Sequence, residues 1–112
     1  MNASNIRFTR SLVLAIVGVF LVAMQARSQD AAGLYKAKCA ACHGTDGKGD
    51  TPVGKKIGVR DFSSPEVQKE SDQELTEITA RGKNKMPGYG STLKNSQIKD
   101  LVAYLRDLAK KG

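Results

Sequence analysis

The chain has 112 residues, with 18 basic and 11 acidic side chains and a formal net charge of +7. One domain is expected, because this length is far below the size at which a single core divides. With two cysteines and one histidine, the chain is neither a multi-cysteine disulfide scaffold nor a protein whose zinc site is closed by Cys and His alone. Its basic residues form no continuous block and are not interleaved with aromatic ones, so the charge does not indicate nucleic-acid binding.

The N-terminal segment has the pattern of a targeting sequence. Arg7 and Arg10 precede a long uncharged, largely apolar run, and a basic start, an apolar middle and small residues at the exit describe a secretory signal peptide. The run is shorter than the roughly 20 apolar residues that a membrane-spanning helix needs. We therefore expect residues 1–28 to be a signal peptide cleaved after Ser28, leaving residues 29–112 as a periplasmic protein. Cleavage after Ala26 and an uncleaved membrane anchor are the alternatives.

Downstream, the pattern of caps, apolar spacing and helix breakers predicts helices and no strand. A first helix is expected to begin with Asp30 as its cap and to end at Gly44, a residue type suited to a left-handed C-terminal turn. The stretch from Gly44 to Pro65 is rich in glycine and lacks alternating apolar residues, so a loop is expected there. The predicted fold class is all-α.

Two more helices follow. Ser71 and Glu74 form a capping box for a short helix that ends at Gly82. A second loop covers residues 83–95, and Ser96 caps the last helix. The apolar stripe of that helix consists of Ile98, Leu101, Val102, Leu105 and Leu108.

The segment Cys39-Ala40-Ala41-Cys42-His43 carries the chemistry. A disulfide between the two cysteines would close too small a loop to stabilise the fold, so they need another role. Cys-x-x-Cys-His is the attachment signature of c-type haem. The two thiols add to the haem vinyl groups, and the His43 nitrogen ligates the iron. We therefore expect one covalent haem c at Cys39 and Cys42, which an exported chain can acquire because the attachment takes place outside the cytoplasm.

The sixth iron ligand can be sought by elimination, with packing in the core as the alternative role of a lone methionine. Met86 is the only methionine of residues 29–112 and lies in a loop with proline and glycine beside it. A thioether suits reduced iron and raises the reduction potential relative to a second histidine. Lys83 and Lys85 are nearby nitrogen donors. We expect the iron to be ligated by His43 and Met86.

Other chemistries can use the same residues. A thiol-disulfide redox protein is the alternative from a different class, but it would carry Cys-x-x-Cys after a strand in a βαβ unit, and no strand pattern precedes Leu34. A zinc site would need Asp or Glu to complete its ligands. A haem sensor or peroxidase, in which Met86 is displaced, is a further alternative.

Three segments in this order resemble the class I c-type cytochromes, in particular the small monohaem exported bacterial members. They are Gly33-Leu34-Tyr35 before the Cys-x-x-Cys-His-Gly segment, Gly82-Lys83-Asn84-Lys85-Met86-Pro87, and Leu101-Val102-Ala103-Tyr104-Leu105-Arg106. The resemblance covers essentially the whole chain after the predicted signal peptide. It implies a cytochrome c fold, with three to four helices and loops wrapped around one haem and the first and last helices crossing at close range.

The resemblance also implies roles for residues around the haem. Gly33 and Tyr104 match a small residue on the first helix and an aromatic residue on the last that meet at their crossing. The Pro52 carbonyl is the candidate acceptor for the His43 ring. Arg60 is a candidate partner of a haem propionate, with a solvated position as the alternative.

Together these residues predict a one-electron carrier rather than an enzyme. With both axial positions filled, the iron cannot readily bind substrate, so its useful chemistry is exchange between Fe(III) and Fe(II). The lysines that flank the ligand segments predict a basic rim that docks on acidic surfaces of redox donors and acceptors; they are Lys36, Lys38, Lys83 and Lys85. The alternative within haem chemistry is an electron-transfer subunit of a larger periplasmic oxidoreductase.

Overall fold

A computed structural model describes residues 30–112 of the chain. The predicted signal peptide, residues 1–28, lies outside the described residues. Helices and connecting loops make up the described part, and its only β-type pairing is an isolated bridge between Lys83 and Met86. The predicted all-α fold class is confirmed. Within residues 30–112, no helix has both the length and the apolar character needed to cross a membrane.

The first helix covers residues 30–38 and, after a turn at Cys39, continues as α2 (Ala40–His43). Asp30 is already helical, so the predicted cap at Asp30 is wrong. Gly44 ends the helical segment as predicted, with a φ of 80° that residues with a Cβ rarely adopt. The chain therefore leaves α2 immediately after His43.

Two short helices, α3 (Pro52–Ile57) and α4 (Pro65–Lys69), follow α2. The prediction of a continuous loop from Gly44 to Pro65 is wrong, because α3 lies inside it. Each helix begins with proline directly after a hydroxyl residue, and the side chains of Thr51 and Ser64 accept hydrogen bonds from backbone N–H groups of the first turn. Proline is favoured at this first position because it needs no hydrogen-bond acceptor there. These prolines start helices instead of preventing them.

The predicted capping box is present at the start of α5 (Asp72–Arg81). The Ser71 side chain accepts from the backbone N–H of Glu74, and the Glu74 carboxylate accepts from the backbone N–H of Ser71. Gly82 ends α5 as predicted. The sequence therefore places this helix correctly at both ends.

The last helix, α6 (Asn95–Lys111), begins before the predicted cap at Ser96, and that cap is wrong. Instead, the side chain of Gln97 accepts a hydrogen bond from the backbone N–H of Lys94 at 2.9 Å. This bond satisfies one of the N–H groups that a helix start leaves without a partner. The helix therefore starts two residues earlier than a Ser96 cap would allow.

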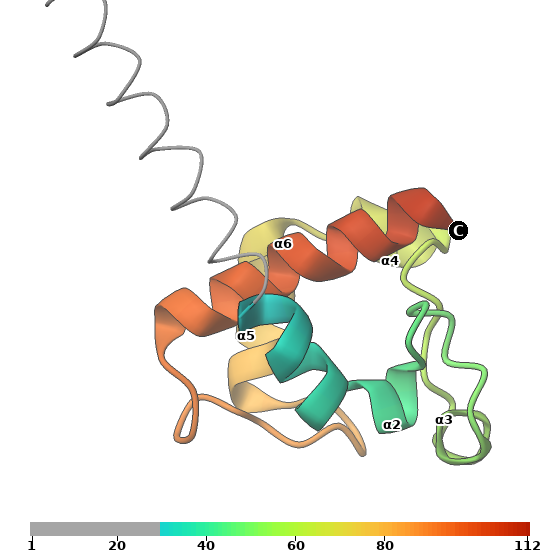
Figure 1. Cartoon of the computed structure of the whole chain (residues 1–112), viewed down its shortest axis with the longest axis horizontal. Helices are drawn as coiled ribbons and strands as arrows, with labels where there is room; N and C mark the ends of the chain where they lie inside the picture. Colours follow the sequence, from blue (N-terminus) through green and yellow to red (C-terminus); the bar gives the residue numbers. More distant parts are fainter. Residues whose placement is uncertain (1–29) are drawn as a thin grey trace, which may run out of the picture.

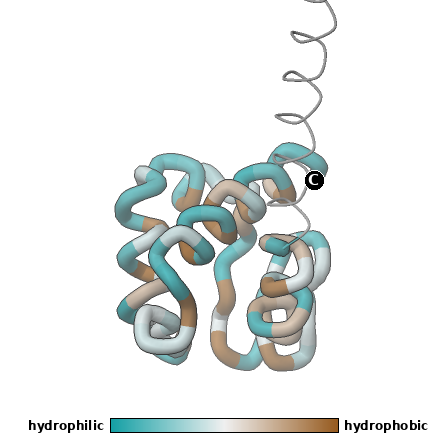
Figure 2. The backbone as a smooth tube through the Cα atoms, turned by 60° about the vertical axis from the view of Figure 1, so that its left-hand side comes forward, coloured by the Kyte–Doolittle hydropathy of each residue, from teal (hydrophilic) through white to brown (hydrophobic). Residues whose placement is uncertain are grey.

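α6 organises the core (Figure 1). α5 packs along it, and the helix of residues 30–38 crosses it, with the rings of Tyr35 and Tyr104 at a centroid distance of 5.2 Å. The predicted apolar stripe is buried, which confirms the orientation of the helix: Ile98, Leu101, Val102, Leu105 and Leu108. In Figure 2 hydrophobic and hydrophilic stretches alternate along the helices, as expected where each helix buries one face.

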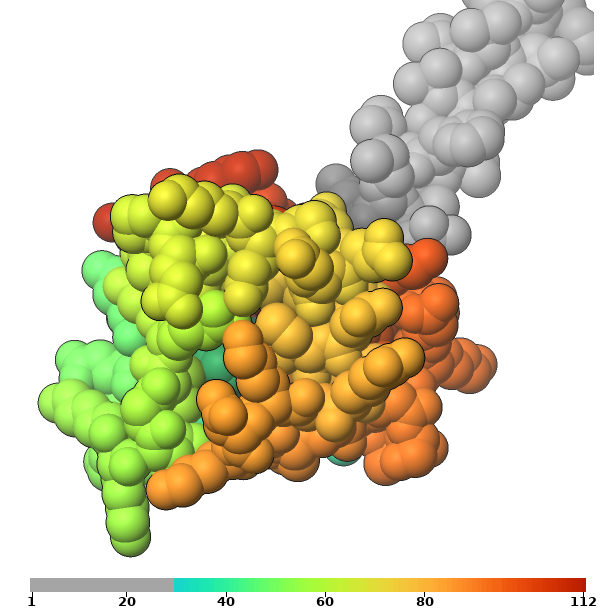
Figure 3. Space-filling view, turned by 180° about the vertical axis from the view of Figure 1, so that it is seen from behind, coloured from blue at the N-terminus to red at the C-terminus, as the bar shows by residue number. Residues whose placement is uncertain are grey.

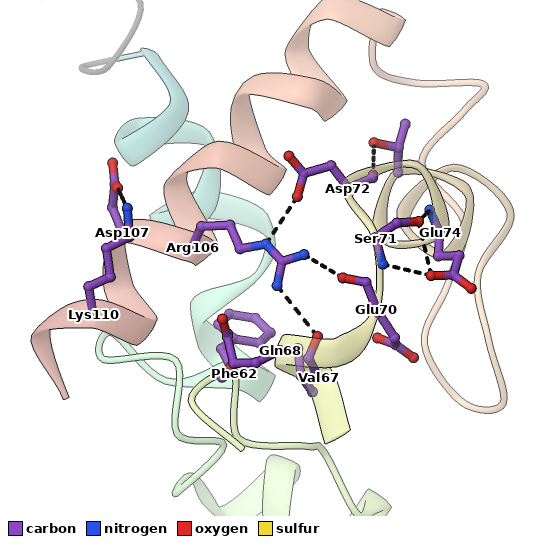
Figure 4. Close-up of polar contacts among 11 residues, drawn as sticks. Phe62, Val67, Gln68, Glu70, Ser71, Asp72, Glu74, Arg106, Asp107 and Lys110 are labelled. Carbon is purple, nitrogen blue, oxygen red and sulfur yellow. Dashed lines mark hydrogen bonds and ion pairs between the residues drawn. The ribbon is translucent and has the colours of Figure 1, made fainter. Parts of the chain in front are cut away.

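Arg106 on α6 joins α4 to α5 (Figure 4). Its Nε donates to the Asp72 carboxylate at 3.0 Å. Its terminal nitrogens donate to the backbone carbonyls of Val67 and Glu70 at 3.4 and 2.5 Å. These carbonyls lie at the C-terminal end of α4, where the Val67 carbonyl also accepts from the backbone N–H of Glu70 at 3.1 Å. One guanidinium thus holds α4 and the start of α5 against α6.

Candidate functional site

A cavity of about 340 Å³ lies between the α2 segment, the chain from α3 to α5 and the loop that follows α5. Its size falls in the range of about 300–1,000 Å³ that is usual for small-molecule and cofactor sites. Cys39, Cys42, His43 and Met86 all line it. Figure 3 shows a hollow between the green residues near position 50 and the orange loop after α5, with teal residues near position 40 inside it.

The wall of the cavity is largely apolar. Besides the four predicted site residues, α5 contributes Leu75 and Ile78, and α6 contributes Leu101 and Leu105. Such a lining excludes water and suits a large apolar ring system better than a charged substrate. The cavity therefore has both the donor atoms and the walls that a haem requires.

Two hydrogen bonds and one close approach position the attachment segment. The Tyr35 hydroxyl donates to the Gly44 carbonyl at 2.7 Å, and the Thr51 hydroxyl donates to the Cys42 carbonyl at 3.0 Å. Gly54 on α3 lies directly against this segment, since a Cβ on Gly54 would overlap the Cys42 carbonyl oxygen. The absence of a side chain on Gly54 lets α3 support the backbone of α2.

His43 is held as a neutral ring. It stacks on Phe62 with a centroid distance of 4.7 Å and an interplanar angle of 28°. Burial, with a smaller contribution from the positive charge of Arg60, lowers the pKa of His43, so the imidazole is uncharged at pH 7, as a metal ligand must be. Its Nδ1 is buried and has no hydrogen-bond partner among the described residues, and the residue lines the cavity. Pro52, at the first position of α3, does not accept from this Nδ1.

Met86 lies in a tight turn directly after α5. The backbones of Lys83 and Met86 exchange hydrogen bonds of 3.1 and 2.9 Å, and Asn84 inside the turn has a φ of 54°. Gly82 has a φ of 82°, and a Cβ on it would lie 2.6 Å from the Met86 carbonyl oxygen. The chain can therefore fold back at Gly82 and carry the half-buried Met86 side chain to the cavity wall.

Arg60 also lines the cavity, but it has carboxylate partners of its own. Its two terminal nitrogens donate to both carboxylate oxygens of Glu70 at 2.8 and 3.1 Å, and Glu66 lies at 3.5 Å. The ion pair between Arg60 and Glu70 thus connects the segment between α3 and α4 to the C-terminal end of α4.

Gly33 and Tyr104 border a second, shallower depression away from the cavity wall. Among the described residues, no atom outside the backbone of its own helix lies within 4 Å of a Cβ placed on Gly33, so Gly33 is not in tight contact with α6. The buried small residue of the first helix is Ala31, 3% exposed, and the ring that contacts Tyr104 is Tyr35. Sequence reasoning missed both roles, although the four-residue spacing of Ala31, Tyr35 and Cys39 identifies one helix face.

The surroundings of the cysteines differ from those of a thiol-disulfide enzyme. Burial raises the pKa of the Cys39 thiol, although Lys38 partly opposes this effect, whereas catalytic thiols have lowered pKa values. No strand precedes the motif within residues 30–112. The surroundings of Cys39 therefore do not activate it for thiol exchange.

Comparisons with known proteins agree with this arrangement. A profile of the family described as "Cytochrome C oxidase, cbb3-type, subunit III" matches residues 26–105. The chain belongs to this family of c-type cytochromes. The matched range includes the attachment segment, all of the cavity lining and the Met86 turn.

Relatives of two kinds are similar to this cytochrome. Cytochrome c6 of Limnospira maxima is 34% identical over 85 residues, which cover 72% of this chain and 92% of that protein. Cbb3-type cytochrome c oxidase subunit CcoP of Azospirillum brasilense is 29% identical over 100 residues, which cover 82% of this chain and 34% of CcoP. The solved structure of KustC0563 c-type cytochrome has a TM-score of 0.64 and 33% identity, covering 69% of this chain and 94% of that one.

These findings confirm the predicted family, fold and cofactor. The chain is a class I c-type cytochrome with the all-α cytochrome c fold, and it carries covalently bound haem c. It is an electron carrier that exchanges electrons with redox partners, and not an enzyme.

Proposed function

We propose that this cytochrome carries single electrons in the periplasm, with its haem held by Cys39 and Cys42 and the iron ligated by His43 and Met86. The observation that carries the proposal is the convergence of these four side chains, from two separate segments, on one apolar cavity. We further propose that residues 1–28 are removed as a signal peptide. Bound haem supplies one-electron exchange between ferric and ferrous iron.

The surrounding residues keep this site in one arrangement. Phe62 fixes the plane of the His43 ring, and Tyr35 and Thr51 fix the backbone on either side of it. The apolar wall formed by α5 and α6 excludes water from the cavity. A ligand set that does not rearrange between oxidation states suits rapid electron exchange, because little reorganisation accompanies each transfer.

The alkaline pyridine haemochrome spectrum tests this proposal, measured after acid–acetone extraction of protein exported together with haem-attachment machinery. We expect a c-type spectrum, retained haem, and an intact mass equal to residues 29–112 plus one haem. A Cys39→Ala variant should show the spectrum of a single thioether. Haem that is extracted by acid–acetone would contradict covalent attachment and return Cys39 and Cys42 to thiol chemistry. A mass that still includes residues 1–28 would contradict cleavage and favour the membrane anchor.

We also propose that partners dock at the mouth of the cavity through acidic surfaces. Lys38, Lys83 and Lys85 line the cavity, and none of the three forms an ion pair among the described residues. Lys36, which was predicted to join them, borders the shallower second depression instead. Three unpaired cations around one opening can steer an acidic partner toward it.

The ionic-strength dependence of electron exchange tests this docking. With an acidic redox protein the bimolecular rate should fall at least about tenfold between low and high salt. A Lys83→Glu, Lys85→Glu double variant should lose most of that dependence. A Lys94→Glu, Lys99→Glu double variant makes the same charge change away from the cavity and serves as the control. Its rate should keep the wild-type dependence on ionic strength. A salt response that is flat in the wild-type protein would contradict the docking proposal.

A second candidate function is that of a subunit in a larger periplasmic oxidoreductase. The specific support is the family description and the match to about a third of CcoP, which indicates that domains of this kind occur within longer oxidase subunits. Co-purification with other polypeptides in fixed stoichiometry would favour the subunit, whereas recovery of the chain alone would favour the diffusing carrier.

A further inference from the structure

Tyr89 connects the two sides of the cavity. Its hydroxyl donates to the backbone carbonyl of Lys38 at 3.1 Å. Lys38 directly precedes Cys39, and Tyr89 lies shortly after Met86. Among the described residues, this is the only hydrogen bond between the loop after α5 and the segment that ends in the attachment motif.

The backbone of Tyr89 is itself fixed. Its N–H donates to the Thr79 carbonyl at 2.9 Å, and its carbonyl accepts from the N–H groups of Thr92 and Leu93 at 3.1 and 2.8 Å. The following residue, Gly90, donates to the Ala80 carbonyl at 2.9 Å. Tyr89 is thus anchored on the end of α5, and its side chain reaches across to the first helix.

The turn that carries Met86 has few connections of its own. Between Gly82 and Tyr89, the hydrogen bonds of the described structure are those that Lys83 and Met86 make with each other. The turn is therefore held at its two ends, by the reversal at Gly82 and by Tyr89. A segment with so few hydrogen bonds opens locally at a lower cost than the core does.

We propose that Tyr89 is a positioning residue, whose hydroxyl bond to Lys38 keeps the Met86 loop closed against the attachment segment and limits the access of external ligands to the iron. The inference rests on the proposed ligation by Met86. Opening of the loop separates it from the segment before Cys39 and so breaks this bond. Removing the hydroxyl should raise the open population about two- to tenfold, the range expected for one net hydrogen bond.

A Tyr89→Phe variant tests the inference, because it keeps the ring and removes only the hydroxyl. We expect the visible spectrum at neutral pH to be unchanged. The rate of carbon monoxide binding to the reduced protein and the imidazole affinity of the oxidised protein should rise about two- to tenfold. The backbone amide of Gly90 should exchange its hydrogen faster. A Ser91→Ala control removes an exposed hydroxyl from the same loop and should behave as the wild type.

The outcomes separate this inference from the proposed function. Unchanged ligand binding and hydrogen exchange in Tyr89→Phe, with a wild type that excludes carbon monoxide, would overturn the role of Tyr89. An equal rise in Ser91→Ala would also overturn it, because the effect would then not depend on the bond to Lys38. A wild-type protein that itself binds carbon monoxide tightly would overturn ligation by Met86 instead.

Discussion

Replacing Met86 with leucine should leave the haem attached and lower the reduction potential by on the order of 100 mV or more. The thioether is a soft ligand that stabilises ferrous iron, and leucine offers no donor atom in its place. Because leucine and methionine have similar volumes, the change in packing alone should cost less than about 1.5 kcal/mol of stability, and the lost iron–sulfur bond adds to that cost. Voltammetry of the purified protein gives the potential, and the pyridine haemochrome spectrum verifies that the haem is still attached.

Ile78→Leu is the matched control for this variant. Ile78 also lines the cavity, and neither isoleucine nor leucine can ligate iron, so the potential should stay near that of the wild type. If Met86→Leu also retains the wild-type potential and still excludes carbon monoxide, Met86 only packs against the cavity wall. Lys83 or Lys85 would then be the candidates for the sixth ligand.

Gly54→Ala should destabilise the protein by about 3 kcal/mol, the upper part of the usual range for overpacking. A Cβ at this position would overlap the Cys42 carbonyl oxygen and lie 2.5 Å from that of Gly49. Both neighbours are backbone atoms, which cannot move aside as a flexible side chain does. Urea unfolding of the haem-loaded protein should show a lower midpoint. Because α3 supports α2, less of the protein should also acquire haem.

Gly33→Ala makes the same chemical change on the first helix and provides the control. A Cβ there meets no atom within 4 Å, and alanine is favoured over glycine within a helix by about 0.5–1 kcal/mol. The midpoint should therefore stay the same or rise. A loss of stability equal to that of Gly54→Ala would contradict the structure at Gly33, and would support the tight helix crossing that the family resemblance implies there.

Residue types and local spacing were sufficient for much of this protein. The attachment motif is contiguous, so its chemistry is readable without a fold, and the scarcity of histidine and methionine left few candidates for the iron ligands. The capping box at Ser71 and the apolar stripe of α6 were also predicted correctly. Both depend on residues within a few positions of each other, where helical geometry alone decides which side chains meet.

Predictions from local patterns were wrong where one residue type occurs in two kinds of structure. Pro52 lies in a glycine-rich stretch whose composition predicts a loop, yet directly after the Thr51 hydroxyl it starts α3. Gly33 matched a family position by type, but the face of the first helix that is buried against the core carries Ala31 and Tyr35. Which helix face is buried depends on the neighbouring helix, and the pattern of one segment does not contain that information.

Contacts between distant segments could be seen only in the folded chain. Arg60 was an isolated loop arginine in the sequence, and folding pairs it with Glu70. The bond from Tyr89 to Lys38 joins residues that are 51 positions apart, and no local signal marks either partner. The cavity itself forms because α5 and α6 pack together and bring the Met86 turn toward α2. Sequence motifs identify the side chains that can bind a haem, because their chemistry depends on residue type. The cavity between those side chains depends on how the helices pack, which the motifs do not specify.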